Sequence, residues 1–241
     1  MKQRSTYYPL LLQPPPTRLQ PTSRVLGKVL RFPVIPRDLL QEFQRVGALL
    51  SQYGLVRGSG GNLSVRIDAN RIVITRHGSC LESLQEADLI IVSIDEKPPA
   101  EASMDTIIHQ EIYRQTNAHA IVHAHPPHVV ALSLFLEDIE PLDTEGSLIF
   151  GSVKVVEAPP GSAELAKLVA NTLHNHKIVV VRAHGTYTAT PTLLEGYHLT
   201  RALDYSCQVC LLAYTLFQVS KVRRILRRLI SNKTGRYDWV V

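Results

Sequence analysis

Apolar and polar positions divide the chain into a proline-rich beginning, a long periodic middle and a short basic end. Residues 1–36 contain seven prolines and follow neither a helical nor a strand period, so we expect an extended or disordered basic arm. Residues 37–218 alternate between helical and strand periodicities, which predicts a single folded domain. Residues 219–241 are set apart as a basic amphipathic tail.

Four segments of the middle region have helical spacing of apolar residues. The first is 38–51, where Asp38 is placed to cap the helix, and another is 162–173, behind Ser162 as a capping residue. The remaining two are predicted over 103–113, with Ser103 or Asp105 at its start, and from about residue 192 to 217.

Strands are predicted wherever short apolar runs alternate or are rich in valine and isoleucine. These runs are residues 62–67, 71–75, 89–94, 120–125 and 178–181, of which the first two are predicted to pair with each other. Three further short segments, 132–135, 148–150 and 153–156, fit a strand or a helix equally well.

Candidate chemistry enters with the run Ala-Ile-Val-His-Ala-His that ends at His125. Because side chains alternate along a strand, His123 and His125 project to one side and Ala124 to the other. A third imidazole, His184, follows the apolar run 178–181 directly before a glycine. Three neutral imidazoles suit zinc or a similar divalent ion and leave one position open for substrate. The pattern therefore predicts a catalytic metal site.

The alternative is that these histidines are ordinary, since the chain contains ten. We prefer that interpretation for the five histidines that share no face with another candidate ligand, which are His119, His128, His174, His176 and His198. The pair at 123 and 125 differs, because two imidazoles side by side on a buried strand are costly to desolvate without a partner.

Two further features could complete such a site. The glycine cluster 58–61 opens onto a strand rather than a helix, so it is neither a Walker loop nor a dinucleotide fingerprint. An anion-binding nest and a plain tight turn fit it equally well, and the His77-Gly78 turn and the Ser103 hydroxyl could supply more donors. Asp105 could cap the helix that it begins. Alternatively, beside a divalent ion its carboxylate could move a proton.

Charge and cysteine content indicate how the charged residues are distributed and which cellular compartment is expected. The formal charge of +5 combines fourteen basic residues and one acid in the two ends with an acidic middle of 12 basic and 20 acidic residues. Three cysteines cannot form a disulfide framework, and no signal peptide or run of about 20 apolar residues is present, so we expect a cytoplasmic protein. Cys207 and Cys210 lie within a helical pattern, which favours core packing over a redox or metal role.

The basic tail has apolar residues on one helical face from 219 to 230 and basic residues on the other. Such a helix could lie on an acidic membrane, but we favour packing on a neighbouring acidic subunit. No nucleic-acid partner is expected.

Several motifs taken in order resemble the class II aldolase and adducin family over about residues 40–217. They are GGNLSVR at 60–66, ITRHG at 74–78, ASMD at 102–105 followed by His109 and Tyr113, AIVHAHP at 120–126, TEG at 144–146 and HG at 184–185. The resemblance implies a three-layer α/β/α fold around a mostly antiparallel sheet, and a homotetramer with active sites between subunits. It also implies zinc on the three histidines, proton transfer at the position of Asp105, and phosphate binding by Asn62, Gly78, Ser103 and their neighbours.

Three departures from the aldolase pattern stand out. Asp105 replaces a glutamate and is shorter in reach by about 1.5 Å. Met104 replaces a second phosphate-binding serine, and His77 replaces a threonine. Asp105 followed by Thr106 is more similar to the epimerases of the family, whereas the TEG motif is more similar to the aldolases. The acid/base aspartate that the epimerases have before Gly151 has no evident counterpart, because Ser147 falls near its place.

We therefore predict a metal-dependent aldehyde-lyase that cleaves a ketose phosphate through an enediolate. Its zinc would lie on His123, His125 and His184, Asp105 would move the proton, and the phosphate would be bound by Asn62, Gly78, Ser103 and His77. The alternatives are a sugar-phosphate 4-epimerase or decarboxylase of the same family. A noncatalytic adducin-like binding protein is disfavoured, because all three histidines are kept.

Overall fold

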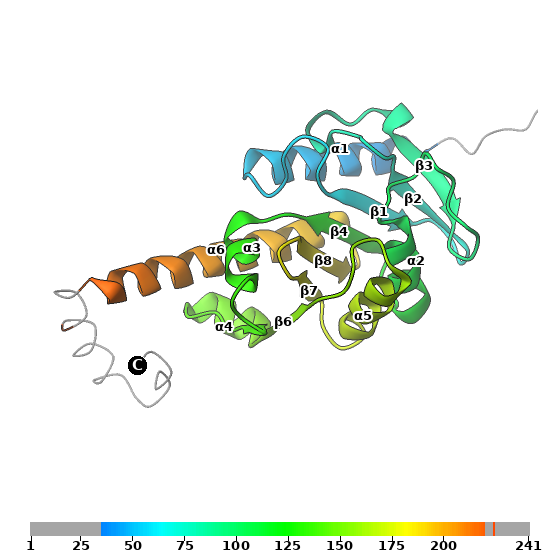
Figure 1. The fold of residues 1–241 in the computed structure, drawn as a ribbon. Coiled ribbons are helices and arrows are strands. Elements are labelled where there is room, and N and C mark those ends of the chain that lie inside the picture. The colour runs from blue at the N-terminus through cyan, green and yellow to red at the C-terminus, as the bar shows by residue number, and fades with distance from the viewer. Residues whose placement is uncertain (1–34, 220–223, 225–241) are drawn as a thin grey trace, which may run out of the picture. The chain divides into compact units, whose positions relative to one another are not determined.

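A computed structural model describes residues 35–219 and Arg224 of the chain (Figure 1). The predicted arm, apart from its last two residues, and the predicted tail, apart from Val219 and Arg224, lie outside the described residues. The division into arm, domain and tail therefore stays a prediction.

One eight-stranded sheet forms the centre of the described region, with the strand order β3-β2-β1-β4-β8-β7-β6-β5. Its strands are β1 (Asn62–Arg66), β2 (Arg71–Thr75), β3 (Leu89–Ser93), β4 (Ala120–Ala124), β5 (Asp138–Ile139), β6 (Val153–Val156), β7 (Ile178–Val181) and β8 (Gly185–Thr190). Only β6 and β7 pair in parallel, and the other neighbours are antiparallel. The predicted mostly antiparallel sheet is confirmed.

Helices cover both faces of this sheet. They are α1 (Arg37–Gln52), α2 (Thr106–Gln115), α3 (Pro127–Ser133), α4 (Thr144–Phe150), α5 (Ala163–Leu173) and α6 (Leu193–Gln218), with two short 3-10 turns at Leu81–Ser83 and Glu86–Asp88. Apolar residues of α2 and α5 form one core with one face of the sheet, and those of α1, α3 and α6 form two cores with the other. The predicted three-layer α/β/α fold is confirmed.

Most predicted elements lie close to their observed positions, and the ambiguous segments are now assigned. Residues 148–150 belong to α4 and 153–156 form β6, while 132–135 contain the end of α3. Ser162 caps α5 by accepting a hydrogen bond from the Leu165 N–H, as predicted. The predicted cap at Asp38 is wrong, because the position before α1 is Pro36 and Asp38 lies in the first turn.

Strand β8 was not predicted, although it lies between β4 and β7 at the centre of the sheet. Its sequence alternates threonine with small or aromatic residues, which hides the apolar periodicity of a central strand. Thr186, Thr188 and Thr190 are nevertheless buried. The Thr188 hydroxyl donates to the Val122 carbonyl at 3.4 Å, so part of the polarity is satisfied by the neighbouring strand.

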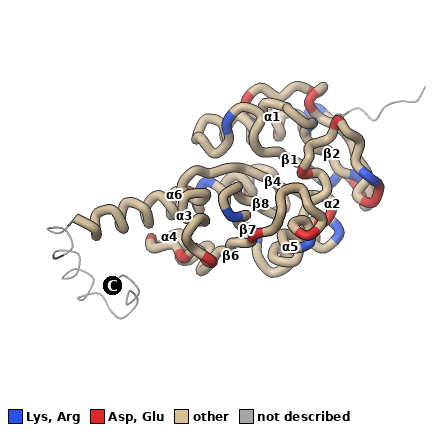
Figure 2. Tube along the Cα trace, in the orientation of Figure 1, with Lys and Arg blue, Asp and Glu red and all other residues tan. Residues whose placement is uncertain are grey.

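The long helix α6 has charged side chains only in its first half. Residues 205–218 carry no charged side chain, and Figure 2 shows this uncharged half extending beyond the sheet. Cys207 packs in the core beside Leu203, as predicted, while Cys210 is half-buried. Among the described residues, no helix is long and apolar enough to span a bilayer.

Candidate metal centre and active site

The three predicted metal ligands converge at one end of the central strands. His123 lies on β4, His125 follows that strand, and His184 lies in the turn between β7 and β8. The Nε2 atom of His123 is 2.9 Å from Nε2 of His125 and 3.0 Å from Nε2 of His184. All three imidazoles therefore offer a ligand atom to one small volume.

The donor set fits a divalent ion. Two imidazole nitrogens on a tetrahedral zinc lie about 3.3 Å apart, because each Zn–N bond is about 2.0–2.1 Å long. The observed separations of 2.9 and 3.0 Å are close to this value. The Nδ1–H of His123 donates to the Thr186 carbonyl at 2.9 Å, which leaves the His123 Nε2 lone pair facing the cluster. Lone pairs held this close repel unless a cation or a proton lies between them.

Burial keeps two of these imidazoles in the form that binds metal. It lowers the pKa of His123 well below its ordinary value of 6.5, although the nearby Asp105 carboxylate acts in the opposite direction. The pKa of His125 is also lowered, first by burial and then by the charge of His184. Neutral imidazoles at neutral pH need not lose a proton before they coordinate a metal.

The glycine cluster packs directly against the histidines. Gly61 has φ +76°, and a Cβ atom added there would lie 2.7 Å from the His123 carbonyl oxygen. A Cβ atom on Gly60 would lie 3.1 Å from Nδ1 of His125. These two glycines allow the loop before β1 to approach the metal strand, a packing role that was not expected from the sequence.

Asp105 lies at the start of α2, but its side chain does not cap the helix. Its Oδ2 atom accepts a hydrogen bond from Nδ2 of Asn62 at 2.8 Å and lies 3.5 Å from Nε2 of His123. Burial opposes ionisation of Asp105, but the pKa of the carboxyl is lowered, because it lies beside the imidazoles of the cluster and accepts the Asn62 hydrogen bond. An ionised carboxylate therefore lies beside the histidine cluster.

Tyr187 belongs to the site and was missed. It pairs with His123 across β8 and β4, and the two rings stack with their centroids 4.1 Å apart and an interplanar angle of 13°. Burial, and then the Asp105 carboxylate, raise the pKa of Tyr187 well above its ordinary value, so the phenol stays protonated. Its position depends on the pairing of β8, which was itself not predicted.

A group of hydrogen-bonded polar side chains lies buried in the core, one turn along α2 from Asp105. His109, one turn along α2, has Nδ1 2.6 Å from the Ser64 hydroxyl oxygen, and that oxygen lies 2.9 Å from the Tyr113 hydroxyl. The pKa of His109 is lowered to about 4, because burial outweighs the attraction of Asp105. This imidazole is therefore neutral near pH 7.

The predicted phosphate ligands are arranged around the start of α2. A β-bridge joins Arg76 to Ala102 and brings the exposed His77-Gly78 turn beside Ser103. The Ser103 hydroxyl accepts the Asp105 N–H at 3.3 Å. Asn62 is buried and donates to Asp105, a role that was not expected from the sequence. Met104, which lies between Ser103 and Asp105 in the sequence, is 74% exposed.

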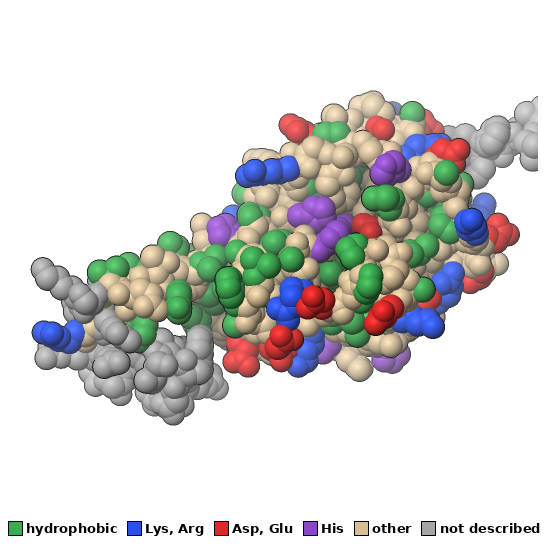
Figure 3. Space-filling model, viewed as in Figure 1, with side chains coloured by type: hydrophobic (Ala, Val, Ile, Leu, Met, Phe, Trp, Pro, Cys, Tyr) green, Lys and Arg blue, Asp and Glu red, His purple; other side chains and the backbone are tan. Residues whose placement is uncertain are grey.

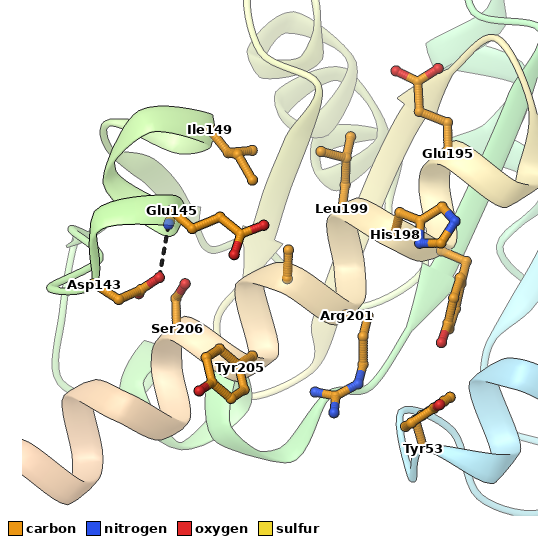
Figure 4. A pocket seen from close by; sticks show the side chains of 13 residues that line it. Tyr53, Asp143, Glu145, Ile149, Glu195, His198, Leu199, Arg201, Tyr205 and Ser206 are labelled. Carbon is orange, nitrogen blue, oxygen red and sulfur yellow. Dashed lines mark hydrogen bonds between the residues drawn. The ribbon is translucent and has the colours of Figure 1, made fainter.

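A separate hollow of about 470 Å³ lies between α4, α6 and Tyr53, and its lining includes none of the three histidines of the cluster (Figure 4). The Glu145 side chain points into it, and the Arg201 guanidinium lies over the Tyr53 ring, 4.9 Å from its centroid. Figure 3 shows histidine side chains near the middle of the visible face, with hydrophobic side chains gathered beside them toward α3, α4 and α6.

Comparisons of sequence and of structure both match this chain to class II aldolases and their relatives. Residues 41–211 match the model of the Class II Aldolase and Adducin N-terminal domain. An L-fuculose phosphate aldolase of Methanococcus vannielii is 34% identical over 172 residues, covering 68% of this chain and 91% of the relative. A 3-oxo-tetronate 4-phosphate decarboxylase of Haemophilus influenzae is 29% identical, covering 77% and 92%. The crystal structure of L-fuculose-1-phosphate aldolase from Thermus thermophilus matches with a TM-score of 0.70 and 36% identity, covering 74% and 95%.

Proposed function

Because the chain belongs to the class II aldolase and adducin family, we propose that it is a divalent-metal-dependent aldehyde-lyase that cleaves a ketose phosphate by a retro-aldol reaction. The observation that carries the proposal is the convergence of three imidazole nitrogens beside an ionised carboxylate. Relatives with aldolase and decarboxylase names break carbon–carbon bonds next to a carbonyl, and both chemistries need an electron sink at that carbonyl.

His123, His125 and His184 would hold the ion, for which zinc is the favoured choice because its preferred ligands include imidazole. A bound divalent ion supplies Lewis acidity that polarises a substrate carbonyl and stabilises an enediolate. Thr186 would fix the orientation of the His123 ring through its carbonyl.

Asp105 would move the proton. In the cleavage direction a substrate hydroxyl loses its proton as the aldehyde forms, and the enediolate carbon then takes up a proton. Asp105 is ionised, lies 3.5 Å from His123 Nε2 and accepts a hydrogen bond from Asn62, which supports its proposed role of accepting that proton and returning it. The neutral Tyr187 phenol would support the carboxylate from the strand β8 side.

The phosphate would be bound near the start of α2 by Gly78, Ser103 and His77. Asn62 would contribute if its hydrogen bond to Asp105 breaks. The bridge between Arg76 and Ala102 supports this grouping, because it brings the 77–78 turn to the start of α2. The helix N-terminus adds favourable dipoles for an anion.

We also propose a cytoplasmic homotetramer. Large apolar side chains are exposed on α4, α6 and the segment after α3, including Phe135 at 83% and Leu148 at 82%. Such a surface is typical of a protein interface, and a second subunit would cover it together with the hollow. The basic tail would pack on an acidic neighbouring subunit in preference to a membrane, and no nucleic-acid partner is proposed.

A sugar-phosphate epimerase or a decarboxylase is the second candidate. The decarboxylase relative supports this alternative. The aspartate at position 105 also supports it, because the aldolase pattern described in the sequence analysis has a glutamate there. Both reactions would use the same ion and the same enediolate.

Product analysis tests the proposal. Purified protein is incubated with ketose 1-phosphates, with and without a chelator, and then with zinc, manganese or cobalt restored. We expect chelator-sensitive release of dihydroxyacetone phosphate. Carbon dioxide release from a 3-oxo acid phosphate, or isomerisation without fragments, would replace the lyase by the second candidate. Absence of both turnover and tight metal would favour a noncatalytic binding protein.

A further inference from the structure

The turn that carries His184 has an unusual backbone. The β7–β8 hairpin reverses direction over residues 182–184, and His184 N–H donates to the Val181 carbonyl at 3.1 Å. Ala183, in the middle of this turn, has φ +58°, the only positive φ at a non-glycine position among the described residues. A Cβ atom disfavours this left-handed conformation, so something outside the turn must hold it.

Ser133, the buried last residue of α3, makes the contacts that hold it. Its Oγ atom accepts the Ala183 N–H at 3.0 Å and donates to the Val130 carbonyl at 2.8 Å. The Ser133 carbonyl oxygen in turn accepts a hydrogen bond from Nη1 of Arg182 at 2.6 Å. Two successive residues before His184 are therefore bound to one residue of α3.

The same short helix is attached to a second candidate ligand. Helix α3 starts at Pro127, two residues after His125. Its first turn is fixed to α6, because the carboxylate of buried Asp204 accepts both the backbone N–H and the ring Nδ1–H of His128, at 3.1 and 3.0 Å. Helix α3 thus connects the segment after His125 to the turn before His184.

We propose that Ser133 is a positioning residue for the metal centre. By holding Ala183 in its left-handed conformation, it keeps Nε2 of His184 within 3.0 Å of Nε2 of His123 and so raises the affinity of the site for a divalent ion. This inference rests on the proposed function, because it assumes that the three histidines bind a metal. Partners that orient metal ligands typically contribute roughly 10- to 100-fold to metal affinity.

Cobalt titration of metal-free protein tests the proposal, because tetrahedral Co²⁺ has visible absorption that reports its ligands as well as its affinity. We expect Ser133→Ala to weaken Co²⁺ binding at least tenfold and to alter the spectrum. Adding Ala183→Gly to that variant should recover part of the affinity, because glycine adopts a positive φ without strain. Ser147→Ala is the control for loss of a serine hydroxyl elsewhere, because it removes a hydroxyl that donates to the Pro141 carbonyl at 2.8 Å and does not hold the turn.

The outcomes separate the inference from the function on which it rests. If wild-type protein binds no Co²⁺, the metal centre itself is wrong. If wild type binds tightly and folded Ser133→Ala binds equally well with the same spectrum, the positioning role is wrong. Should Ser133→Ala fail to fold, Ala183→Val provides the test with the hydroxyl intact, because a β-branched residue resists a positive φ. Equal affinity in that variant would also overturn the proposal.

Discussion

Buried His109 makes the stability of the protein sensitive to mild acid. Its pKa is about 4 in the folded protein, compared with an ordinary value of 6.5, because the side chain is completely buried. Between these two values the unfolded chain binds a proton that the folded protein does not. Stability from this group is therefore complete above pH 6.5 and is lost as the pH falls toward 4.

The size of the effect follows from the two pKa values. Each pH unit between them costs about 1.4 kcal/mol, so the fall from pH 7 to pH 5 removes about 2 kcal/mol of unfolding free energy. His109→Asn removes the titration, and the asparagine amide can still reach the Ser64 hydroxyl. We expect the loss between pH 7 and pH 5 to be smaller by about 2 kcal/mol in this variant than in wild type.

Urea unfolding at pH 7, 6 and 5, followed by circular dichroism in the presence of a chelator, measures this difference without a contribution from bound metal. The matched control is His119→Asn, which makes the same change of side chain at an exposed position outside the core. If His109→Asn loses as much stability as wild type over this range, the imidazole is not buried in its neutral form and the reasoning fails.

Three further substitutions test other parts of the structure. Gly61→Ala should lower unfolding free energy by about 2–4 kcal/mol and weaken metal binding, because φ is +76° and the new Cβ would meet the His123 carbonyl; denaturation and Co²⁺ titration measure both effects. Tyr187→Phe should lower kcat about tenfold with metal content unchanged, because Asp105 loses the phenol beside it; steady-state kinetics with metal analysis checks this. Ser162→Ala should cost about 1 kcal/mol through the lost α5 cap and leave kcat unchanged, as denaturation and a turnover assay would show.

The fold was largely predictable, because its elements have strong periodicity. Helices α1 and α5 and strands β2 and β7 follow apolar patterns that match their burial. Strand β8 escaped notice because buried threonines look polar in a sequence, while their hydroxyls are partly satisfied by carbonyls that only the folded chain provides. Segments such as 148–150 were ambiguous, since three apolar residues define no period.

The site was predictable where the type of residue and its local pattern indicate metal binding. His123 and His125 share a strand face by simple alternation, and the structure brings them together with His184. Asp105 was ambiguous, because a helix cap and a carboxylate beside a metal have the same local sequence. Tyr187 and Ser133 could not be found in this way, since the first depends on the register of β4 against β8 and the second on a contact between α3 and a distant hairpin.

The most direct test of the central claim measures metal content and turnover together in wild type, His123→Ala and His119→Ala. The two substitutions remove the same side chain, but only His123 belongs to the converging cluster. We expect wild type and His119→Ala to retain about one divalent ion per chain and to release dihydroxyacetone phosphate from a ketose 1-phosphate, whereas folded His123→Ala loses both. Unchanged metal content and turnover in His123→Ala would contradict the proposed metal centre and the mechanism built on it.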